Sequence, residues 1–484
     1  MEKEQESAVM PPAEPEKPTG AGLVRRLGLF DMTMLVMGSV IGVGIFAAPN
    51  AVAEIAGNSA IVLAAWIIGG LVAMAGGLVY AEWTRRRPDV GGQYAFLREA
   101  YHPALAFVYG WSLLWIIQSG GMAAVAVVFS EYCLELLSLA GYQVVESDVR
   151  ILSKGDVLWY MVVKGLIATV AIGTLTIVNC TGVRTGGTTQ NIFMVLKILA
   201  IGMLLVCGAM FAAGWIDGTA APSLSPTSAV TGTEGAGFGS VALLGAALVP
   251  VFFSYGGWHT TTFVGEEVRD PRKTLSRALV LGILGVIVLY VAVNWVCLRV
   301  LGVEYLAQTK KPAAAVMELA LGRTGAALIS IGIAISALGF LSQATLTSPR
   351  VYYAMARDGL FFRSVAWIHP RTRVPAVAIL LQGAFAIVIA VTGTFRTIIN
   401  YTMPVEMLFW SLTALGLFII RRRDSGSNAN LSMPGHPYTT LLFVAVNLAV
   451  LAVQSYQEPM KTAIPACIAL AAIPVYYYWR HRRS

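Results

Sequence analysis

The length of its uncharged apolar segments most constrains what this chain can fold into. Residues 60–81, for example, contain no Asp, Glu, Lys or Arg. An α-helix of ~20 residues crosses the ~30 Å hydrocarbon layer of a bilayer. Since 57% of the 484 residues are hydrophobic and only 12% are charged, most of the chain is suited to lipid rather than to water. The sequence therefore predicts an all-α polytopic membrane protein.

About twelve segments reach spanning length by the same criterion. Each is dominated by apolar residues, and stretches with charged, Gly or Pro residues separate one from the next. We expect spans at residues 29–55, 60–83, 103–137, 156–181, 189–213, 239–267, 279–301, 324–357, 374–392, 397–421, 438–457 and 462–479.

Lys and Arg indicate the orientation of these spans, because basic residues resist translocation and gather in cytoplasmic loops. If the N-terminus is cytoplasmic, most of the 34 basic residues fall in the inner segments. The sequence thus predicts a multi-pass protein of the cell membrane, inner or plasma, with both termini in the cytoplasm. The net charge of +8 is then a topology signal, so no nucleic acid is expected as a partner.

The order of the spans divides the chain into five parts. Residues 1–28 begin with a polar stretch rich in Pro and Glu and are expected to form a disordered cytoplasmic tail. The spans within 29–213 and within 239–421 are expected to form two inverted repeats of five helices. Two further helices within 438–479 and a cytoplasmic tail at 480–484 follow. No obvious internal sequence repeat supports this division.

Glycine clusters interrupt two of the predicted spans. The first span has Gly38, Gly42 and Gly44 within seven residues, and the sixth has Gly256 and Gly257. Glycine has low helix propensity and lets a ligand approach the backbone. Unwound backbone is tolerated in a membrane only where protein or a cavity satisfies it, and the first and sixth spans correspond in two inverted repeats. The alternative is that these glycines only let helices pack closely.

Two such breaks suit a zwitterionic ligand. The ends of half-helices offer free N–H groups to a carboxylate and free C=O groups to an ammonium. We therefore expect the backbone to bind the α-carboxylate and α-amine of an amino acid, with side chains giving specificity. The predicted substrate-binding residues are Ser39, Val40, Ile41, Gly42, Val43, Gly44, Phe253, Ser254, Tyr255, Gly256 and Gly257.

Three ionisable residues within the predicted spans are functional candidates, because such residues are costly in a membrane. Lys197 lies in the apolar run 192–206 and is either a proton carrier or a permanently charged strut. His259 directly follows the second break and is a proton-sensing or substrate-binding residue, or a helix-packing one. Glu406 is a candidate to relay a proton or to contact a substrate amine, and the alternative is a structural pair.

Other residue types point to no further chemistry. Lys164 and Arg350 lie nearer the membrane faces and are left outside the expected site. The five cysteines lack the spacing of a disulfide framework or a metal site. No phosphate-binding loop or nucleophile elbow has a supporting context. The sequence therefore predicts no enzyme activity, no metal and no cofactor.

Residues 38–46, Gly-Ser-Val-Ile-Gly-Val-Gly-Ile-Phe, resemble the first-helix motif of the amino acid, polyamine and organocation transporter superfamily. Residues 255–258, Tyr-Gly-Gly-Trp, are similar to the sixth helix of its L-type amino acid transporter branch. The resemblance extends from about Leu29 to Arg423. Further matching motifs lie at residues 80–82, 91–92, 99–101, 110–111, 179–180, 183–184, 266–271 and 336–339.

The resemblance implies the leucine transporter fold, a 5+5 inverted repeat plus two helices, with alternating access. It places the amine of Lys197 near the first break and Ser336, where sodium-coupled relatives bind a sodium ion. It also makes Phe253 an aromatic gate, although an ordinary packing aromatic is the alternative. His259 departs from the family, which usually has Asn there. So do Phe340, Ser342 and Gln343 in the eighth span.

Together these features predict a sodium-independent carrier of neutral L-amino acids in a lipid bilayer, either an exchanger or a proton symporter. No acid in either break selects a cationic side chain, and no Arg selects an acidic one. No obligate protein partner is expected. The alternatives are a polyamine or cationic amino acid transporter, for which Glu406 would have to line the pocket, and a membrane amino acid sensor that does not transport.

Overall fold

The computed structural model describes residues 25–88, 91–139, 154–216, 238–393, 395–424 and 433–483. Most of the predicted N-terminal tail, residues 1–24, lies outside this part of the chain. The predicted C-terminal tail instead continues the last helix as far as Arg483.

Helices make up all the named elements of the described residues, and an isolated bridge joins Leu27 to Val268. η1 is a π-helix, and η2 and η3 are 3-10 helices. In chain order the elements are α1 (Leu29–Val40), α2 (Gly44–Ala56), α3 (Ser59–Arg86), α4 (Gln93–Ala100), α5 (Pro103–Ser112), η1 (Leu113–Ile117), α6 (Gln118–Leu139), α7 (Lys154–Cys180), α8 (Val183–Ala212), α9 (Phe238–Tyr255), η2 (Trp258–Glu267), α10 (Pro271–Gln308), α11 (Pro312–Thr347), α12 (Pro349–Arg357), η3 (Arg363–Ala366), α13 (Ala376–Thr392), α14 (Phe395–Arg423), α15 (Tyr438–Gln457), α16 (Pro459–Leu470) and α17 (Ala472–Arg483).

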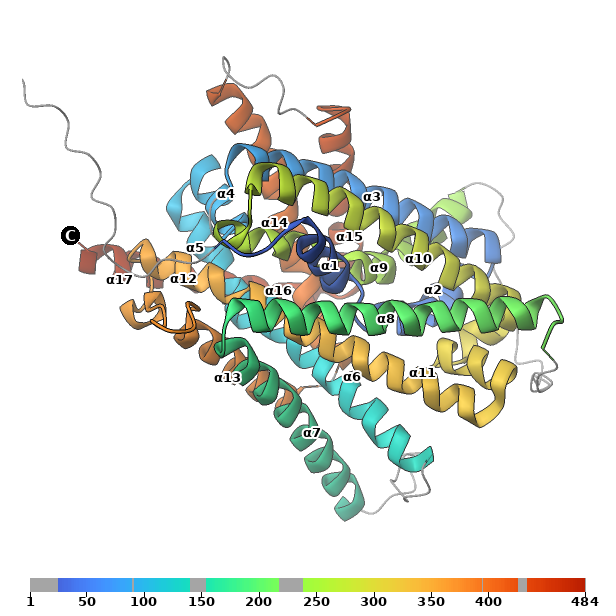
Figure 1. The fold of residues 1–484 in the computed structure, drawn as a ribbon. Helices are drawn as coiled ribbons and strands as arrows, with labels where there is room; N and C mark the ends of the chain where they lie inside the picture. Colours follow the sequence, from blue (N-terminus) through green and yellow to red (C-terminus); the bar gives the residue numbers. More distant parts are fainter. Residues whose placement is uncertain are drawn as a thin grey trace, which may run out of the picture.

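Long apolar helices dominate the architecture (Figure 1). Among the described residues, nine are long and apolar enough to cross a membrane, and the bent pair α1 and α2 makes a tenth. These helices confirm the all-α class. The count of twelve spans stays a prediction, because α13 has only 17 residues and a break separates α9 from η2.

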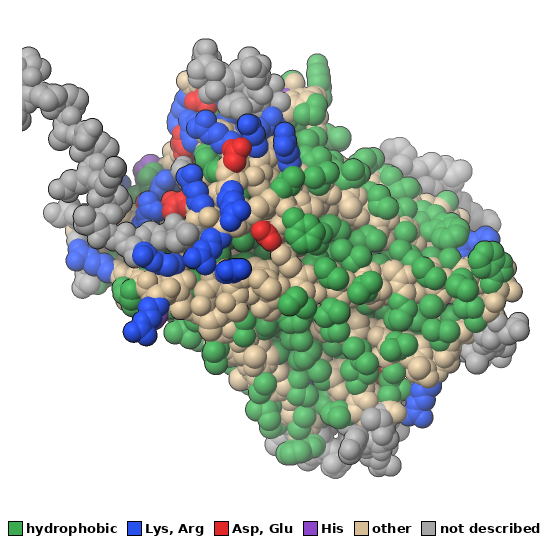
Figure 2. Space-filling model, viewed as in Figure 1, with side chains coloured by type: hydrophobic (Ala, Val, Ile, Leu, Met, Phe, Trp, Pro, Cys, Tyr) green, Lys and Arg blue, Asp and Glu red, His purple; other side chains and the backbone are tan. Residues whose placement is uncertain are grey.

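The outward faces of these helices are strongly apolar. Leu71 of α3, Leu166 of α7, Leu199 of α8 and Val288 of α10 each expose more than 60% of their surface. Figure 2 shows hydrophobic side chains spread across the face that carries α8 and α10. Water would penalise this exposure, whereas lipid does not. The surface therefore supports the predicted placement in a membrane.

Long helices pack around the broken first span and hold it in the interior. α10 packs along α3 and α1, while α11 packs against α8 and α6. Close approach depends on small residues: a Cβ on Gly77 of α3 would lie 2.2 Å from Cδ1 of Ile283 on α10. Both breaks are consequently buried among helices.

Charged side chains gather at the end of the molecule that carries α4, α5 and α17 (Figure 2). Glu82, which is buried near the end of α3, pairs there with Arg421 of α14 and with Arg86. The prediction that Arg350 lies towards a membrane face differs from the structure, which buries this residue completely. Its Nε lies 2.7 Å from Oε1 of the equally buried Glu267. The acid compensates the charge that burial would otherwise penalise.

Candidate functional site

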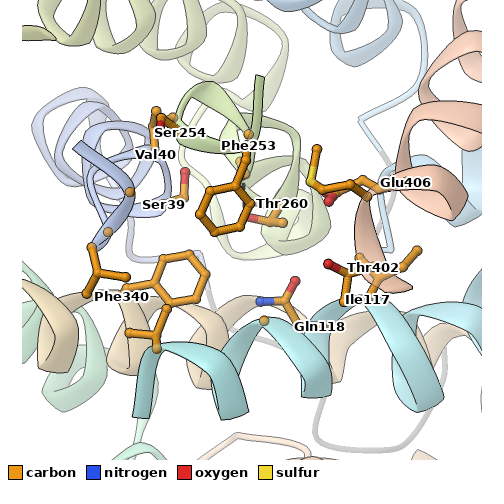
Figure 3. Close-up of a pocket in the computed structure, with 18 of the residues that line it drawn as sticks. Ser39, Val40, Ile117, Gln118, Phe253, Ser254, Thr260, Phe340, Thr402 and Glu406 are labelled. Atoms are coloured by element: carbon orange, nitrogen blue, oxygen red, sulfur yellow. Dashed lines mark hydrogen bonds between the residues drawn. The ribbon is translucent and has the colours of Figure 1, made fainter. Parts of the chain in front are cut away.

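A pocket lies between the two interrupted spans (Figure 3). It holds about 690 Å³ of empty space, part of which is open solvent. Its walls come from both breaks and from η1, α6, α11 and α14. The lining residues are Ser39, Val40, Gly42, Val43, Gly44, Ile117, Gln118, Gly121, Val125, Phe253, Ser254, Gly256, Gly257, Thr260, Phe340, Gln343, Thr402, Met403 and Glu406.

The first break separates α1 from α2. α1 ends at Val40 and α2 begins at Gly44, and the two are bent by 41°. The first N–H groups of a helix have no acceptor within it, and that end carries a partial positive charge. Because Val43 and Gly44 line the pocket, the start of α2 is suited to a carboxylate.

The second break separates α9 from η2 and lies directly against the first. Gly257 has a φ of 97°, and a Cβ there would lie 2.3 Å from the carbonyl oxygen of Ser39. Both the positive φ and this close approach require glycine. The glycine therefore lets the two breaks share one pocket.

Tyr290 of α10 links the carbonyl ends of α1 and α9. Its hydroxyl oxygen lies 3.0 Å from the carbonyl oxygen of Val40 and 3.1 Å from that of Ser254. A hydroxyl has one proton to donate, so the two carbonyls share it. A bound ammonium can supply the second donor. No local sequence pattern indicates Tyr290, because it is one aromatic residue in an apolar span.

Lys197 of α8 is fully buried beside the first break. Its Nζ donates to the carbonyl of Ile41 and, at 3.5 Å, to that of Gly38. The hydroxyl of Ser336 on α11 donates to the carbonyl of Gly42 at 2.9 Å. The cation and the hydroxyl thus satisfy the negative, C-terminal end of α1. Neither side chain is among the described residues that line the pocket.

Two of the predicted substrate-binding residues point away from the pocket. Ile41 is fully buried, and its carbonyl is engaged by Lys197. The hydroxyl of Tyr255 donates to the carbonyl of Trp66 at 3.1 Å, and its ring packs against Tyr290. The other nine predicted residues line the pocket.

His259 and Glu406 lie beside each other, with Glu406 at the pocket wall. Nε2 of His259 is 3.5 Å from Oε1 of Glu406, and Nε1 of Trp410 donates to Nδ1 of His259 at 3.1 Å. Since Nδ1 accepts that hydrogen bond, a neutral His259 carries its proton on Nε2, toward Glu406. The side chain of Glu406 is 14% exposed and that of His259 is 1% exposed. Glu406 alone of the two reaches the cavity.

The α6 and α11 walls of the pocket are not among the predicted substrate-binding residues. Ile117 and Gln118 lie where the π-helix η1 meets α6, and such wider turns occur frequently at functional sites. The polar, glycine-containing run 118–121 inside an apolar span was the available signal. Phe340 and Gln343 were recognised as departures from the family pattern, and both line the pocket.

Comparison with known proteins identifies the family. The family model described as amino acid permease matches residues 27–475, so the chain belongs to this family. The predicted superfamily and leucine transporter fold are thereby confirmed, and the family is one of transporters rather than enzymes.

Named relatives align over nearly the whole chain. The serine/threonine exchanger SteT of Bacillus subtilis is 28% identical over 466 residues, which cover 96% of this chain and 98% of that protein. The large neutral amino acids transporter small subunit 2 of Homo sapiens is 29% identical over 484 residues, with coverage of 97% and 84%. The Asc-type amino acid transporter 1 of Mus musculus is 27% identical over 468 residues, with coverage of 95% and 82%.

Proposed function

We propose that this chain is a sodium-independent secondary transporter of neutral L-amino acids that works by alternating access, as an exchanger or a proton-coupled symporter. The observation that carries the proposal is that the two helix breaks face one pocket. They present helix N–H groups and carbonyl ends together, and an α-amino acid has the complementary carboxylate and ammonium. The names of the relatives, one of them an exchanger and all of them specific for amino acids, agree with this cargo.

Lys197 supports sodium independence. Its ammonium donates to the carbonyl oxygens at the end of α1. Carbonyl oxygens are the type of ligand that a sodium ion would need. A cation that is covalently attached to the chain removes the need for a soluble one. We infer that Lys197 and Ser336 together replace a sodium site and that Phe253, which lines the pocket, acts as its gate.

The placement of charge supports the proposed topology. Basic side chains gather at the end that carries α17, as expected if that end faces the cytoplasm of a cell membrane. We propose that both termini lie on this side and that the chain works without an obligate protein partner. Because the human relative is named a small subunit, transport should be tested with this chain purified alone.

Counterflow in proteoliposomes tests the proposal. Purified protein is reconstituted, and uptake of each of the twenty amino acids is measured with sodium or choline, and with or without a proton gradient. We expect uptake of neutral L-amino acids that is indifferent to sodium. A gradient-driven rise in uptake identifies symport, and its absence identifies exchange. Strong sodium stimulation would contradict the role of Lys197, and binding without flux would favour the amino acid sensor.

The position of Glu406 favours a second candidate function, transport of cationic amino acids or polyamines. An acid in the pocket wall is the condition that this function requires, and Glu406 fulfils it. Loss of cationic uptake in Glu406→Gln, together with no neutral uptake by either protein, would establish this candidate in place of the first.

A further inference from the structure

The pocket wall opposite the first break contains polar side chains among apolar ones, in contrast to the Phe253 and Phe340 rings. Figure 3 shows Ser39 and Val40 on one side of the cavity, and Glu406, Thr402 and Gln118 on the other. A cargo whose main chain is bound at the breaks extends its side chain toward this opposite wall. The polar residues of this wall are therefore in position to contact the side chain of the cargo and to select among side chains.

The carboxyl group of Glu406 lies near a histidine but, among the described residues, pairs with no Lys or Arg. Within the part of the chain that the structure describes, no Lys or Arg forms an ion pair with Glu406, and its only basic neighbour within 4.0 Å is His259. The 3.5 Å separation exceeds the ~2.7–2.9 Å of a strong charge-assisted hydrogen bond. A carboxyl group in a membrane interior is costly without a good donor. The contact with His259 leaves this requirement largely unmet.

The hydrogen bond from Trp410 orients His259 so that a donor, rather than an acceptor, faces Glu406. Trp410 donates to Nδ1 of His259, and this directs the Nε2 proton of His259 toward Oε1 of Glu406. Trp258 stacks on Trp410 with centroids 5.7 Å apart, which holds the indole in place. His259 and Trp410 are therefore positioning residues, and the part of the carboxylate exposed to the cavity faces the cargo.

We propose that Glu406 determines side-chain specificity by accepting a hydrogen bond from a donor group on the cargo, a hydroxyl or an ammonium. The inference rests on the proposed function: a hydroxyl donor would narrow its class of neutral amino acids, and an ammonium donor would correspond to the second, cationic candidate. In either case amino acids with a donor-bearing side chain are favoured over apolar isosteres. A binding site that accepts a hydrogen bond rejects an analogue that lacks the donor, because the buried acceptor is then left unsatisfied.

Two pairs of nearly isosteric amino acids test the inference, one pair with short side chains and one with long side chains. Threonine and valine compare a hydroxyl near the main chain with a methyl group, and lysine and 2-aminoheptanoic acid compare an ammonium at the end of a long side chain with a methyl group. Competition against counterflow is measured for the intact protein. In at least one pair we expect the donor-bearing member to compete about tenfold better or more. Equal competition within both pairs would overturn the inference.

Substitutions at Glu406 and next to it show whether this residue carries the preference. In Glu406→Met, which keeps the length but removes the acceptor, the ratio should fall to about one. Glu406→Gln keeps one acceptor oxygen and should restore part of it. Met407→Leu, on α14 next to Glu406 but not among the described residues that line the pocket, is the matched control and should keep the full ratio. An unchanged ratio in Glu406→Met would overturn the inference.

A binding measurement separates this inference from the proposed function. Thermal stabilisation of the detergent-purified protein by each amino acid of the two pairs requires no transport. If no amino acid is transported but the donor-bearing members stabilise the intact protein more than Glu406→Met, the proposed function fails and the subsite stands. If transport occurs without this difference, the subsite fails and the proposed function stands.

Trp410→Phe tests the positioning role, because it keeps an aromatic ring and removes the indole donor. The apparent affinity for the donor-bearing amino acid should fall about threefold to tenfold, with a smaller effect on its apolar isostere and on the maximal rate. A uniform loss of rate for both members of a pair would assign Trp410 a structural role only.

Discussion

The pocket and the charged end of the molecule differ in how their acidic and basic side chains are compensated. At the charged end, the carboxylate of Glu82 accepts from Arg421 at 2.8 and 2.5 Å, from Arg86 at 2.8 Å and from the backbone N–H of Met433 at 2.8 Å. Near the pocket, Lys197 is held by carbonyls, and among the described residues the one basic side chain within 4.0 Å of Glu406 is a histidine, at 3.5 Å.

The difference separates structural charges from functional ones. Charges at the charged end neutralise each other, so they join α3 to α14 and need nothing from outside the chain. Lys197 and Glu406, near the pocket, do not pair with each other. Lys197 interacts with the end of α1, and Glu406 is available to interact with the cargo. Substitution should therefore impair transport at the pocket and stability at the charged end.

The largest expected effect is that of Lys197→Ala on transport. Without the ammonium, the carbonyls of Gly38 and Ile41 lose their donor and the end of α1 is no longer held. Counterflow should fall at least about a hundredfold, which corresponds to roughly 2.7 kcal/mol. Lys164→Ala is the matched control, because Lys164 pairs with Glu131 away from the pocket, and it should retain most of the flux. Equal losses in the two variants would contradict the comparison.

The next effect is on stability, from breaking the buried Glu267 and Arg350 pair. Both side chains are fully buried, so Arg350→Met leaves an uncompensated acid and should cost about 3–5 kcal/mol of unfolding free energy. A lower melting temperature in detergent measures this. The double variant Glu267→Gln with Arg350→Met should recover part of the loss, and no recovery would mean that packing rather than charge is responsible.

A smaller difference is expected between the two acids. Glu82→Gln should destabilise the protein by about 1–3 kcal/mol, because two arginines and a backbone donor lose a charged acceptor. Glu406→Gln should change stability by less than about 1 kcal/mol, since it disturbs one long contact. Both are measured by thermal melting without cargo, and a larger loss in Glu406→Gln would reverse the comparison.

The smallest effect belongs to the pair between Glu266 and Arg357. It lies beside the buried Glu267 and Arg350 pair, but its side chains are 34% and 50% exposed. Solvent weakens such a pair, so Arg357→Met should cost less than about 1 kcal/mol. A melting shift as large as that of Arg350→Met would show that burial does not distinguish the two pairs.

Much of the fold could be predicted from sequence, because helices that cross a lipid bilayer have a recognisable sequence pattern. Spanning helices need long apolar runs, and the runs over 60–83 and 438–457 lie close to α3 and α15. The first break was predictable, since three glycines in seven residues weaken a helix. Departures occur where polar sequence is helical too: α8 begins at Val183 rather than 189, and α4 in the loop 91–102 was not predicted.

The site was only partly predictable, because its walls depend on contacts between distant spans. The breaks carried their own signal in glycine, whereas Gln118 and Tyr290 reach the breaks only through helix packing. Glu267 and Arg350 are 83 residues apart, and nothing in the local sequence pairs them. Ile41 and Tyr255 show the converse limit, since a break turns some of its residues away from the cavity.

The most direct test of the central claim is whether the two breaks bind the main-chain charges of an amino acid. Competition against counterflow is measured for one neutral L-amino acid, for the amine that lacks its carboxylate and for the acid that lacks its amine. We expect the amino acid to compete and both analogues to compete at least about a hundredfold more weakly, because each leaves one set of helix-end groups without a partner. Equal competition by either analogue would contradict binding of the main chain at the breaks.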